Sequence, residues 1–563
     1  MYLWNTETHT MIYPKTPLAQ SIIQICQAKG IKNIIISPGS RNASLTIGFV
    51  NNPEFNCYSI ADERSAAFFA IGIAKQIQKP VAVVCTSGSA LLNYYPAFAE
   101  AFYSQIPLIV ISADRPQSKI DIGDGQTIRQ ENVFKNHSLF NANLTEEASV
   151  ENDLKINHAI NKAFTKKGPV HINAPFEEPL YQTVTKLNVD VTISSFANVR
   201  KKISVDEIIA FTSIWNTSKN KLILVGENRP NEIDTEIINR LATDNSVVVM
   251  TETTSNLHHP SFLNNIDTII TPFTNREFKN LQPDILITFG GMVVSKRIKA
   301  FLRKYPAKHH WHIDSLRAYD TFGCLTKHFE VDPNQFFTQF LRFATPIRSN
   351  YNSTFQAIAT LRKRKHQEYL TKIPFSDFTV FGKVIPSLPA NSMLHISNSS
   401  AIRYAQLFDI DSSIQVFCNR GTSGIDGSTS TAIGSAVANE KPTILITGDI
   451  GFLYDSNALW NEYIPNNFKI ILINNGGGGI FRILPGHEET PVFNTFFETS
   501  HCFTAENLAK MYGFEYSIAS NEASLEASLI SLYVQNDKPS ILEIFTPTLE
   551  NDKILLQYFR ELV

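Results

Sequence analysis

Short runs of apolar, mostly β-branched residues recur along the chain without polar alternation. Examples are IKNIIIS, PVAVVCTSG, PLIVISA, KLILVG, NSVVVM, DILITFG, PTILITGD, KIILINN and PSILEIF. Runs of this kind are typical of strands that are buried on both faces of a parallel sheet. The stretches between them, such as ERSAAFFAIGIAKQIQ, have apolar residues at helical spacing, as repeated βα units require. The pattern predicts an α/β protein built from doubly wound parallel sheets.

The two ends of the chain resemble each other. AIGIAKQIQKP begins at Ala70 and AIGSAVANEKP begins at Ala432, an offset of 432 − 70 = 362 residues with six of eleven positions identical. The same ungapped offset brings further pairs into register: Ser37 with Ser399, Arg41 with Arg403, Val81 with Thr443 and Leu108 with Ile470. Buried strands and alanine-rich helices can converge in composition, but convergence does not explain a common register. We therefore expect an internal duplication.

Two polar stretches divide the chain. One covers residues 182–203, and the other runs from Thr345 to about Phe375 and contains the basic run RKRK at 362–365. Because this run has helical spacing and Glu368 nearby, we interpret it as a solvated helix face and not as a partner-binding patch. We expect domains over residues 1–185, 200–345 and 375–563, of which the first and third are the two copies.

Composition narrows the class of protein. The 563 residues are 43% hydrophobic and 18% charged, which excludes a disordered chain or a coiled coil. With 50 Lys and Arg against 52 Asp and Glu, the net charge is −2, so we expect no nucleic-acid partner. The six cysteines are scattered and form no CxxC motif, which is typical of a reducing compartment. The start of the sequence has no leader pattern, and no apolar run approaches the roughly 18 residues of a membrane span. We therefore expect a cytoplasmic protein.

Two motifs in the third domain predict a metal site. Gly448-Asp449 ends one predicted strand and Asn474-Asn475 ends the next, with Asn475 placed 26 positions after Asp449 and followed by four glycines. The carboxyl ends of neighbouring parallel strands meet at one edge of a sheet, where α/β proteins bind ligands. Carboxylate, amide and main-chain oxygens suit Mg²⁺, which commonly also holds substrate phosphates. A capping Asp and a flexible glycine turn are the alternative for either motif alone.

Together these motifs resemble the GDG…NN signature of thiamine-diphosphate enzymes, with Ile450 as the third residue of GDG. This cofactor requires a carboxylic acid against its pyrimidine nitrogen. Glu63, in ADERSAAFFAIGIA, follows an apolar stretch and begins a predicted helix. Taken alone, Glu63 would more often be an acid favoured by a helix N-terminus, but the duplication of the domain favours the cofactor role. We expect the first copy to bind the pyrimidine and the third domain to bind the diphosphate.

A more specific resemblance covers nearly the whole chain. In order, the motifs are SPGSRNASL, DERSAAFFAIGIAK, TSGSALLNYYPAFAEA, ISADRP, GQTIRQ, HINAPFEEPLY, FGGMVVSKR, NRGTSGIDGSTSTAIG, GDIGFLYDSNAL and NNGGGGIF. They resemble the 2-succinyl-5-enolpyruvyl-6-hydroxy-3-cyclohexene-1-carboxylate synthase family of menaquinone biosynthesis, in which the third residue of GDG is a larger apolar one. The sequence departs from the family at Asn42-Ala43-Ser44, where Ser-Thr-Pro is usual, and at Ser89, where Thr is usual.

The resemblance implies a carboligation in which 2-oxoglutarate loses CO₂ and the remaining four-carbon unit adds to isochorismate. It implies thiamine diphosphate with Mg²⁺, which Mn²⁺ can replace, and a homodimer or homotetramer with active sites at subunit interfaces. Catalytic roles fall on Glu63 and Gln126, and metal ligation falls on Asp449, Asn475 and the Gly477 carbonyl. The other implied cofactor contacts are Ser89, Ile425, Gly448, Ile450 and Phe481.

Both substrates are dicarboxylates, so the resemblance implies a set of cations and hydroxyls around them. A guanidinium suits a carboxylate because two parallel hydrogen bonds fix its position and orientation. Taken singly, each arginine would more often be a surface residue. The implied substrate-binding positions are Ser40, Arg41, Arg115, Gln126, Lys296, Arg297, Ser399, Arg403 and Arg420.

Two other interpretations remain open. The chain could be another thiamine-diphosphate enzyme, such as a 2-oxoacid decarboxylase or an acetohydroxyacid synthase, or a relative that binds the cofactor without catalysis. Within the middle domain, HHWHID at 309–314 is interpreted as a strand and not as a metal site. Gly290-Gly291 lacks a GxGxxG context, and we expect no flavin.

Overall fold

The computed structural model describes residues 11–195, 201–484, 486, 488–534 and 537–563. Residues 1–10, on which part of the expectation about a leader rests, and 196–200, inside the expected first linker, lie outside the described residues. By its internal contacts the chain forms two units. The first comprises Met1–Asn198, Gly421–Glu440 and Asp455–Pro465, and the second comprises Val199–Arg420, Lys441–Tyr454 and Asn466–Val563.

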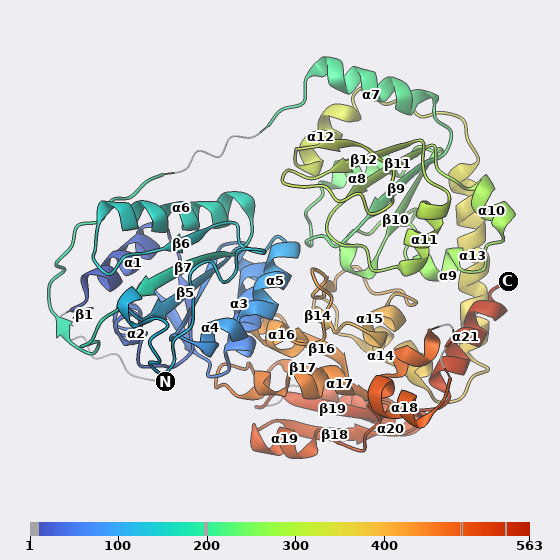
Figure 1. Ribbon diagram of the computed structural model, residues 1–563. Helices are drawn as coiled ribbons and strands as arrows, with labels where there is room; N and C mark the ends of the chain where they lie inside the picture. Colours follow the sequence, from blue (N-terminus) through green and yellow to red (C-terminus); the bar gives the residue numbers. More distant parts are fainter. Residues whose placement is uncertain (1–10, 196–200, 485, 487, 535–536) are drawn as a thin grey trace. The chain divides into compact units, whose positions relative to one another are not determined.

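The first unit contains a six-stranded parallel sheet (Figure 1). Its strands follow the order β3 (Asn56–Ser59), β2 (Asn33–Ile36), β4 (Val81–Cys85), β5 (Leu108–Asp114), β7 (Val170–Pro175) and β6 (Asn141–Asn143). Apolar side chains of one face form a core with α1 (Pro17–Ala28), α2 (Ala43–Val50) and α6 (Val150–Lys166). The other face packs on α3 (Glu63–Ile77), which also contacts α4 (Ser89–Asn93), α5 (Tyr95–Tyr103) and α16 (Ser428–Val437).

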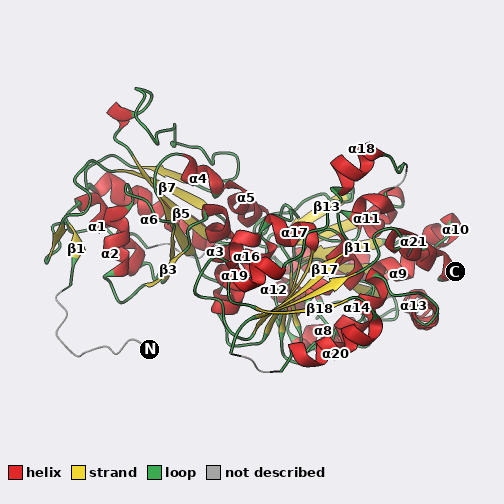
Figure 2. Cartoon of the chain, turned by 90° about the horizontal axis from the view of Figure 1, so that it is seen from below, coloured by secondary structure: helices red, strands yellow, loops and turns green. Residues whose placement is uncertain are grey.

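The second unit contains two further parallel sheets; Figure 2 draws the strands of the chain in yellow and its helices in red. The central sheet has the order β10 (Val247–Thr251), β9 (Lys221–Val225), β11 (Ile285–Phe289), β12 (His309–Ile313) and β13 (Leu325–Phe329). One face packs on α7 (Val205–Thr217), α8 (Thr235–Leu241) and α12 (Pro333–Phe340). The other packs on α9 (Ile266–Ile270), α11 (Lys296–Lys304) and α13 (Tyr351–Leu370).

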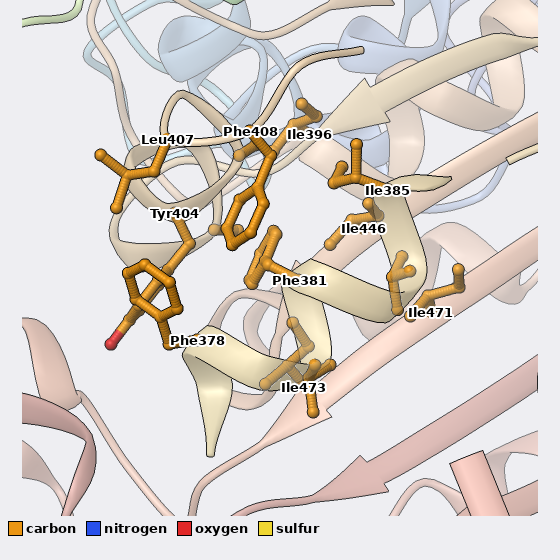
Figure 3. Close-up of a cluster of buried hydrophobic side chains, with 14 of the residues drawn as sticks. Phe378, Phe381, Ile385, Ile396, Tyr404, Leu407, Phe408, Ile446, Ile471 and Ile473 are labelled. Carbon is orange, nitrogen blue, oxygen red and sulfur yellow. The ribbon is translucent and has the colours of Figure 1, made fainter. Parts of the chain in front are cut away.

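The last sheet repeats the strand order of the first. It runs β15 (Gln415–Phe417), β14 (Met393–Ile396), β16 (Thr443–Gly448), β17 (Phe468–Asn474), β19 (Ser540–Phe545) and β18 (Glu515–Ala519). One face forms a core with α14 (Asp377–Ser387), α15 (Ser400–Ala405), α20 (Glu522–Leu532) and α21 (Asn551–Glu561). Figure 3 shows part of this core, in which Phe378 and Phe381 of α14 and Tyr404 of α15 lie among strand isoleucines.

Short elements complete the chain: β1 (Tyr13–Pro14) paired antiparallel with β8 (Thr183–Val184), α10 (Asn275–Asn280), α17 (Asp449–Tyr454), α18 (Pro491–Phe493), α19 (Glu506–Met511), and the single turns η1 (Gln117–Lys119), η2 (Thr253–Ser255), η3 (Ser456–Leu459), η4 (Gly479–Ile483) and η5 (Asn494–Glu498). The predicted class, three doubly wound parallel sheets with the first and third related by duplication, is confirmed.

The sheet registers refine the duplication. Val81 and Thr443 begin the equivalent strands β4 and β16, and their neighbours are Leu108 and Phe468, which are 360 residues apart and not 362. At the start of the copies, Ser37 N–H donates to the Val84 carbonyl and Ser397 N–H donates to Ile446, both at 2.9 Å. Ser37 therefore matches Ser397, and the ungapped pairing with Ser399 is wrong. The connections between strands differ in length by two residues, in opposite senses.

The second polar stretch folds as a helix. α13 spans most of it, and Tyr351 and Phe355 belong to the core of the central sheet. Lys363 and Arg364 are exposed, as predicted, but Arg362 is only 6% exposed and donates to the Leu562 carbonyl. The burial of Arg362 corrects the prediction of a solvated helix face at this one position, because its guanidinium donates to a carbonyl at the end of α21.

Within the described residues, no helix combines the length and the apolar character that a membrane span needs.

Candidate active site

Asp449 and Asn475 stand at the carboxyl ends of two neighbouring parallel strands, β16 and β17. Oδ1 of Asp449 accepts the N–H of Ile450 at 2.7 Å, and Oδ2 accepts those of Gly476 at 2.9 Å and Gly477 at 3.0 Å. Burial raises the pKa of the Asp449 carboxyl, and these three donors oppose the rise. The structure thus brings together the two motifs that the sequence separates by 26 positions.

A buried acid orients the Asn475 amide. Its Nδ2 donates to Asp377 Oδ2 at 3.0 Å, while Thr546 Oγ1 donates to Asp377 Oδ1 at 2.5 Å. Burial raises the pKa of Asp377 to about 6, and its hydrogen bonds from Thr546 and Asn475 oppose this. Thr548 Oγ1 also donates to the Asn475 carbonyl at 2.6 Å. Because the amide nitrogen is engaged, the amide oxygen is the atom that Asn475 has for a further ligand.

The residues at this edge fit a magnesium diphosphate. A carboxylate, an amide oxygen and the Gly477 carbonyl form the kind of oxygen set that Mg²⁺ takes. A side chain at position 477 would place its Cβ 2.8 Å from the Glu498 carbonyl, so the close approach of the turn requires glycine. The described residues contain no group of three or more His, Cys, Asp or Glu side chains placed for a metal.

His501 belongs to this edge and was missed by sequence reasoning. Its side chain is 6% exposed and its Nε2 lies 3.4 Å from Asp449 Oδ2. The Phe503 N–H donates to His501 Nδ1 at 3.1 Å, so the neutral ring carries its proton on Nε2, the nitrogen that faces Asp449. The sequence gives little indication of this role, because His501 lies 52 positions after Asp449 and belongs to no recognised motif.

The first unit carries a second cluster at the carboxyl ends of β2, β3, β4 and β5. Ser40 is exposed, whereas Arg41 is 4% exposed and donates to the Phe176 carbonyl at 3.0 Å and to Glu178 Oε1 at 3.1 Å. A Cβ at Gly39 would lie 2.3 Å from Thr86 Cβ, so the loops after β2 and β4 touch. Arg41 is therefore engaged within its own unit.

Glu63 begins α3, half-buried at the same edge. Asp62 caps the helix by accepting from Ser65 N–H at 3.1 Å, and Asn457 donates to the other Asp62 oxygen at 2.7 Å. Glu63 Oε2 itself accepts from Asn93 Nδ2 at 3.3 Å. The cap fixes the first turn of α3 and with it the direction in which the Glu63 side chain leaves the helix.

Gln126 and Ser89 are exposed, and Gly88 brings their loops together. A Cβ at Gly88 would lie 3.2 Å from the Gln126 carbonyl oxygen. Gln130, which sequence reasoning also missed, accepts the Gly88 N–H at 2.8 Å and donates to Asn173 Oδ1 at 2.8 Å from a fully buried position. The same loop edge holds Arg115, whose Nε is buried with no hydrogen-bond partner among the described residues.

An apolar cavity of about 430 Å³ adjoins this cluster. Ile36 at the end of β2, Pro38 and Gly39 after it, and Cys57 and Tyr58 of β3 line the cavity. Burial raises the pKa of the Cys57 thiol to about 12, so the thiol is neutral and the lining is apolar.

In the second unit, the predicted cations gather around two acids, the half-buried Asp267 and the buried Glu252. Asp267 interacts electrostatically with Arg297 and Arg403, and burial is the main cause of the raised pKa of its carboxyl. Ser399 has a φ of 72° and its carbonyl accepts from Arg403 Nη1 at 2.8 Å. Arg420 Nη1 donates to Asn398 Oδ1 at 2.6 Å.

Glu252 is the second of these acids. Its carboxylate accepts the N–H groups of Val294 at 2.5 Å and Ser295 at 2.6 Å, immediately before Lys296 and Arg297. Burial raises the pKa of Glu252 to about 7. Lys299, one turn after Lys296, interacts with Glu252 and Arg420 and was not predicted, although its spacing of three on a helix was a readable signal.

The two units therefore hold separate sets of the predicted residues. The first holds Ser40, Arg41, Glu63, Ser89, Arg115, Gln126 and Ile425. The second holds Lys296, Arg297, Ser399, Arg403, Arg420, Gly448, Asp449, Ile450, Asn475, Gly477 and Phe481, the last 36% exposed.

Three family models match the chain in succession. They are "Thiamine pyrophosphate enzyme, N-terminal TPP binding domain" over residues 16–138, "Middle domain of thiamine pyrophosphate" over 199–396 and "Thiamine pyrophosphate enzyme, C-terminal TPP binding domain" over 399–544. Thiamine pyrophosphate is thiamine diphosphate. The match of binding-domain models at both ends agrees with the repeated sheet topology.

Solved and curated proteins give the same result at two levels. Benzoylformate decarboxylase from Polynucleobacter necessarius superposes with a TM-score of 0.72 over 94% of this chain and 99% of its own at 15% identity, which shows the fold. Proteins named 2-succinyl-5-enolpyruvyl-6-hydroxy-3-cyclohexene-1-carboxylate synthase are 70% identical in Flavobacterium johnsoniae and 67% in Flavobacterium psychrophilum, over 98% of this chain and 100% of theirs. One from Phocaeicola vulgatus is 37% identical over 96% of this chain and 97% of its own.

The chain belongs to the 2-succinyl-5-enolpyruvyl-6-hydroxy-3-cyclohexene-1-carboxylate synthase family of thiamine-diphosphate enzymes.

Proposed function

We propose that this enzyme decarboxylates 2-oxoglutarate and adds the resulting four-carbon unit to isochorismate in a 1,4-addition. The products are 2-succinyl-5-enolpyruvyl-6-hydroxy-3-cyclohexene-1-carboxylate and CO₂, in menaquinone biosynthesis. The observation that carries the proposal is the 70% identity over the full length of a relative named for this product.

Asp449, Asn475 and the Gly477 carbonyl would hold Mg²⁺, or Mn²⁺ in its place, against the cofactor diphosphate. When bound, thiamine diphosphate supplies the nucleophilic carbon and the electron sink that decarboxylation of a 2-oxoacid needs. The proposal is supported by the three N–H donors that fix Asp449 and by the acid that orients the Asn475 amide. Gly448, Ile450, Ile425, Ser89 and Phe481 would contact the same cofactor.

Glu63 would hold a proton against the pyrimidine nitrogen. Its half-buried place at the first turn of α3, with the turn fixed by the Asp62 cap, supports this role. Gln126 would orient a substrate or a water through its exposed amide, since the Gly88 loop packs against its main chain.

Hydroxyls and cations would hold the dicarboxylate substrates. Ser40, Arg41, Arg115 and Gln126 belong to the first unit, and Lys296, Arg297, Ser399, Arg403 and Arg420 to the second. The buried Nε of Arg115 supports a carboxylate partner there, because a buried donor without an acceptor is costly. Arg41 would have to exchange its exposed partner Glu178, whose side chain is 68% exposed, for substrate.

We further infer a homodimer or homotetramer, in which the pyrimidine and diphosphate sites of an active site come from different subunits. A species that is monomeric by analytical ultracentrifugation and fully active in the turnover assay would contradict this. None of the six cysteines forms a disulfide in the part of the chain that the structure describes, which supports a reducing compartment such as the cytoplasm.

The test supplies 2-oxoglutarate, isochorismate, Mg²⁺ and thiamine diphosphate and follows the loss of isochorismate absorbance. We expect loss with the native enzyme, little loss with Glu63→Gln and undiminished loss with Glu54→Gln, a matched change at an exposed acid of the same domain. Chelation should stop turnover, and Mg²⁺ or Mn²⁺ should restore it.

Each competing interpretation predicts a different result. Consumption of 2-oxoglutarate without isochorismate would favour a simple 2-oxoacid decarboxylase, and consumption of pyruvate would favour an acetohydroxyacid synthase. Cofactor binding without any turnover would favour a non-catalytic relative. Undiminished isochorismate loss in Glu63→Gln would refute the role of Glu63.

A further inference from the structure

The segment Gly421–Gly427 leads from β15 to α16 in the sequence and carries Ile425, one of the proposed cofactor contacts. Arg420, a proposed substrate contact, directly precedes it. The segment contains no helix or strand of its own. Something other than regular backbone hydrogen bonding must therefore hold it in place.

The Glu100 carboxylate of α5 accepts four hydrogen bonds, three from this segment and one from Ser104 at the end of its own helix. Oε1 accepts from the Gly421 N–H at 2.8 Å and from Ser104 Oγ at 2.7 Å. Oε2 accepts from the Thr422 N–H at 2.6 Å and from Thr422 Oγ1 at 2.9 Å. Glu100 is 0% exposed, so its charge is stabilised by these donors and not by water.

The packing at both ends of the segment requires glycine. A Cβ at Gly421 would lie 2.6 Å from the Glu100 carbonyl oxygen and 3.0 Å from the Ser104 nitrogen, so the segment lies directly on the last turn of α5. At the other end, a Cβ at Gly427 would lie 2.1 Å from the ring of Phe68 on α3. Ile425 is therefore placed between two close contacts with helices of the first copy.

We propose that Glu100 is a positioning residue that holds the Gly421–Gly427 segment so that Ile425 meets the cofactor. The proposal rests on the proposed function for the role of Ile425, but the clamp itself is a property of the chain. Glu100, at the buried centre of AFAEAFY, accepts the N–H groups of Gly421 and Thr422. A glutamine at this position would direct an N–H donor toward one of these two N–H groups.

The test measures hydrogen exchange at the Gly421 and Thr422 amides of the full-length protein without cofactor. In Glu100→Gln we expect these amides to exchange about 10- to 100-fold faster, because one carboxylate acceptor becomes a donor. The matched control is Ser104→Ala, which removes a hydrogen bond to the same carboxylate but leaves both amides bonded, and which should exchange like the native protein.

A second variant keeps the test decisive if Glu100→Gln does not fold. Gly421→Ala leaves Glu100 intact and pushes the segment off α5, so it should show the same faster exchange. Calorimetric titration with thiamine diphosphate and Mg²⁺ should then show at least about tenfold weaker binding in both variants, since the segment is displaced in both.

The outcomes separate the two proposals. Native exchange rates in Glu100→Gln, or in Gly421→Ala where the former is unfolded, would overturn the clamp whatever the enzyme's substrate. Faster exchange with native cofactor affinity would overturn the positioning role. Absence of turnover with 2-oxoglutarate and isochorismate in the native enzyme would refute the proposed function and would leave the exchange result to decide the clamp.

Discussion

Gly72 of α3 and Gly434 of α16 hold equivalent positions in the two copies, and each faces the main chain of the other's helix. A Cβ at Gly72 would lie 2.2 Å from the Thr431 carbonyl oxygen, and a Cβ at Gly434 would lie 2.0 Å from that of Phe69. Ser435 Oγ also donates to the Gly72 carbonyl at 3.1 Å. The duplicated helices thus cross in a pseudo-symmetric contact that depends on both glycines, which also accounts for their place in the repeated AIG motif.

Alanine at either glycine is expected to destabilise the protein by about 1–3 kcal/mol or more, because a methyl group would separate two helices whose main chains touch. Thermal unfolding of Gly72→Ala and Gly434→Ala measures this. Gly125→Ala is the control, since a Cβ there meets nothing within 4 Å. Equal melting temperatures for all three variants would contradict the close crossing.

The sequence was sufficient for the sheets and for the edges at which ligands bind. Runs such as VAVVC became fully buried strands, and the endings of two such runs placed Asp449 beside Asn475 because neighbouring parallel strands end together. The offset of 362 found the duplication but missed its compensating two-residue length changes. An ungapped comparison cannot detect these, since the sheet register and not the residue count defines equivalence.

The acids and amides behind the site could not be predicted. Glu252, Asp377 and Gln130 act on residues 42 to 98 positions away, and only the folded chain shows which main-chain groups they meet. Glu100 did carry a signal, since it is a single charge inside the apolar helix AFAEAFY. A lone charge in a buried helix requires donors from elsewhere, which the sequence implies without naming.

Gln130→Met is expected to lower stability and to weaken binding at the Gln126 loop. The variant keeps the shape of the side chain but leaves the Gly88 N–H without its acceptor, at a cost of about 1–3 kcal/mol. Asn173 Oδ1 loses one donor and keeps the hydrogen bond from Ser112 Oγ. The melting temperature and the KM for both substrates measure the effect. Gln117→Met, at an exposed position of the same domain, should behave like the native enzyme.

Acid should destabilise the first unit through His171. Burial lowers the pKa of His171 to about 3 from 6.5, and its ring lies beside Ser112 and Phe134. Between these two values the unfolded chain binds the extra proton, so the free energy of unfolding rises with pH up to 6.5 and falls as pH drops toward 3. In His171→Gln the slope should be smaller by about 1.4 kcal/mol per pH unit. Melting curves between pH 4 and 8 check this, and parallel curves would contradict it.

His501 should influence the metal more than the fold. Its Nε2 proton faces Asp449 Oδ2 at 3.4 Å, and partners of metal ligands change metal affinity by about 10- to 100-fold. His501→Phe should therefore need more Mg²⁺ for half-maximal cofactor binding. His501→Gln, whose amide nitrogen can replace Nε2, should need nearly the native concentration. An equal requirement in both variants would leave His501 only a packing role.

Glu252→Gln is expected to raise the KM for the dicarboxylate substrates about tenfold with little change in kcat, because one of the acceptors for Val294 and Ser295 is lost and the start of α11 loosens. The Gln variant should also change the pH dependence of stability. Burial raises the pKa of Glu252 to about 7 from 4.5, so the folded chain holds the proton more tightly and the free energy of unfolding falls as pH rises from 4.5 to 7.

Removal of the titrating group should abolish that fall, so the native enzyme and Glu252→Gln should differ in melting temperature by different amounts at pH 5 and pH 8. Glu236→Gln, at an exposed position on α8, controls for the loss of a surface charge. A rise in KM that also appears in Glu236→Gln would assign the effect to net charge. A native KM in Glu252→Gln would show that Lys296 and Arg297 keep their positions without this acid. Lys299 would then be the next cation to substitute, because it interacts electrostatically with Glu252.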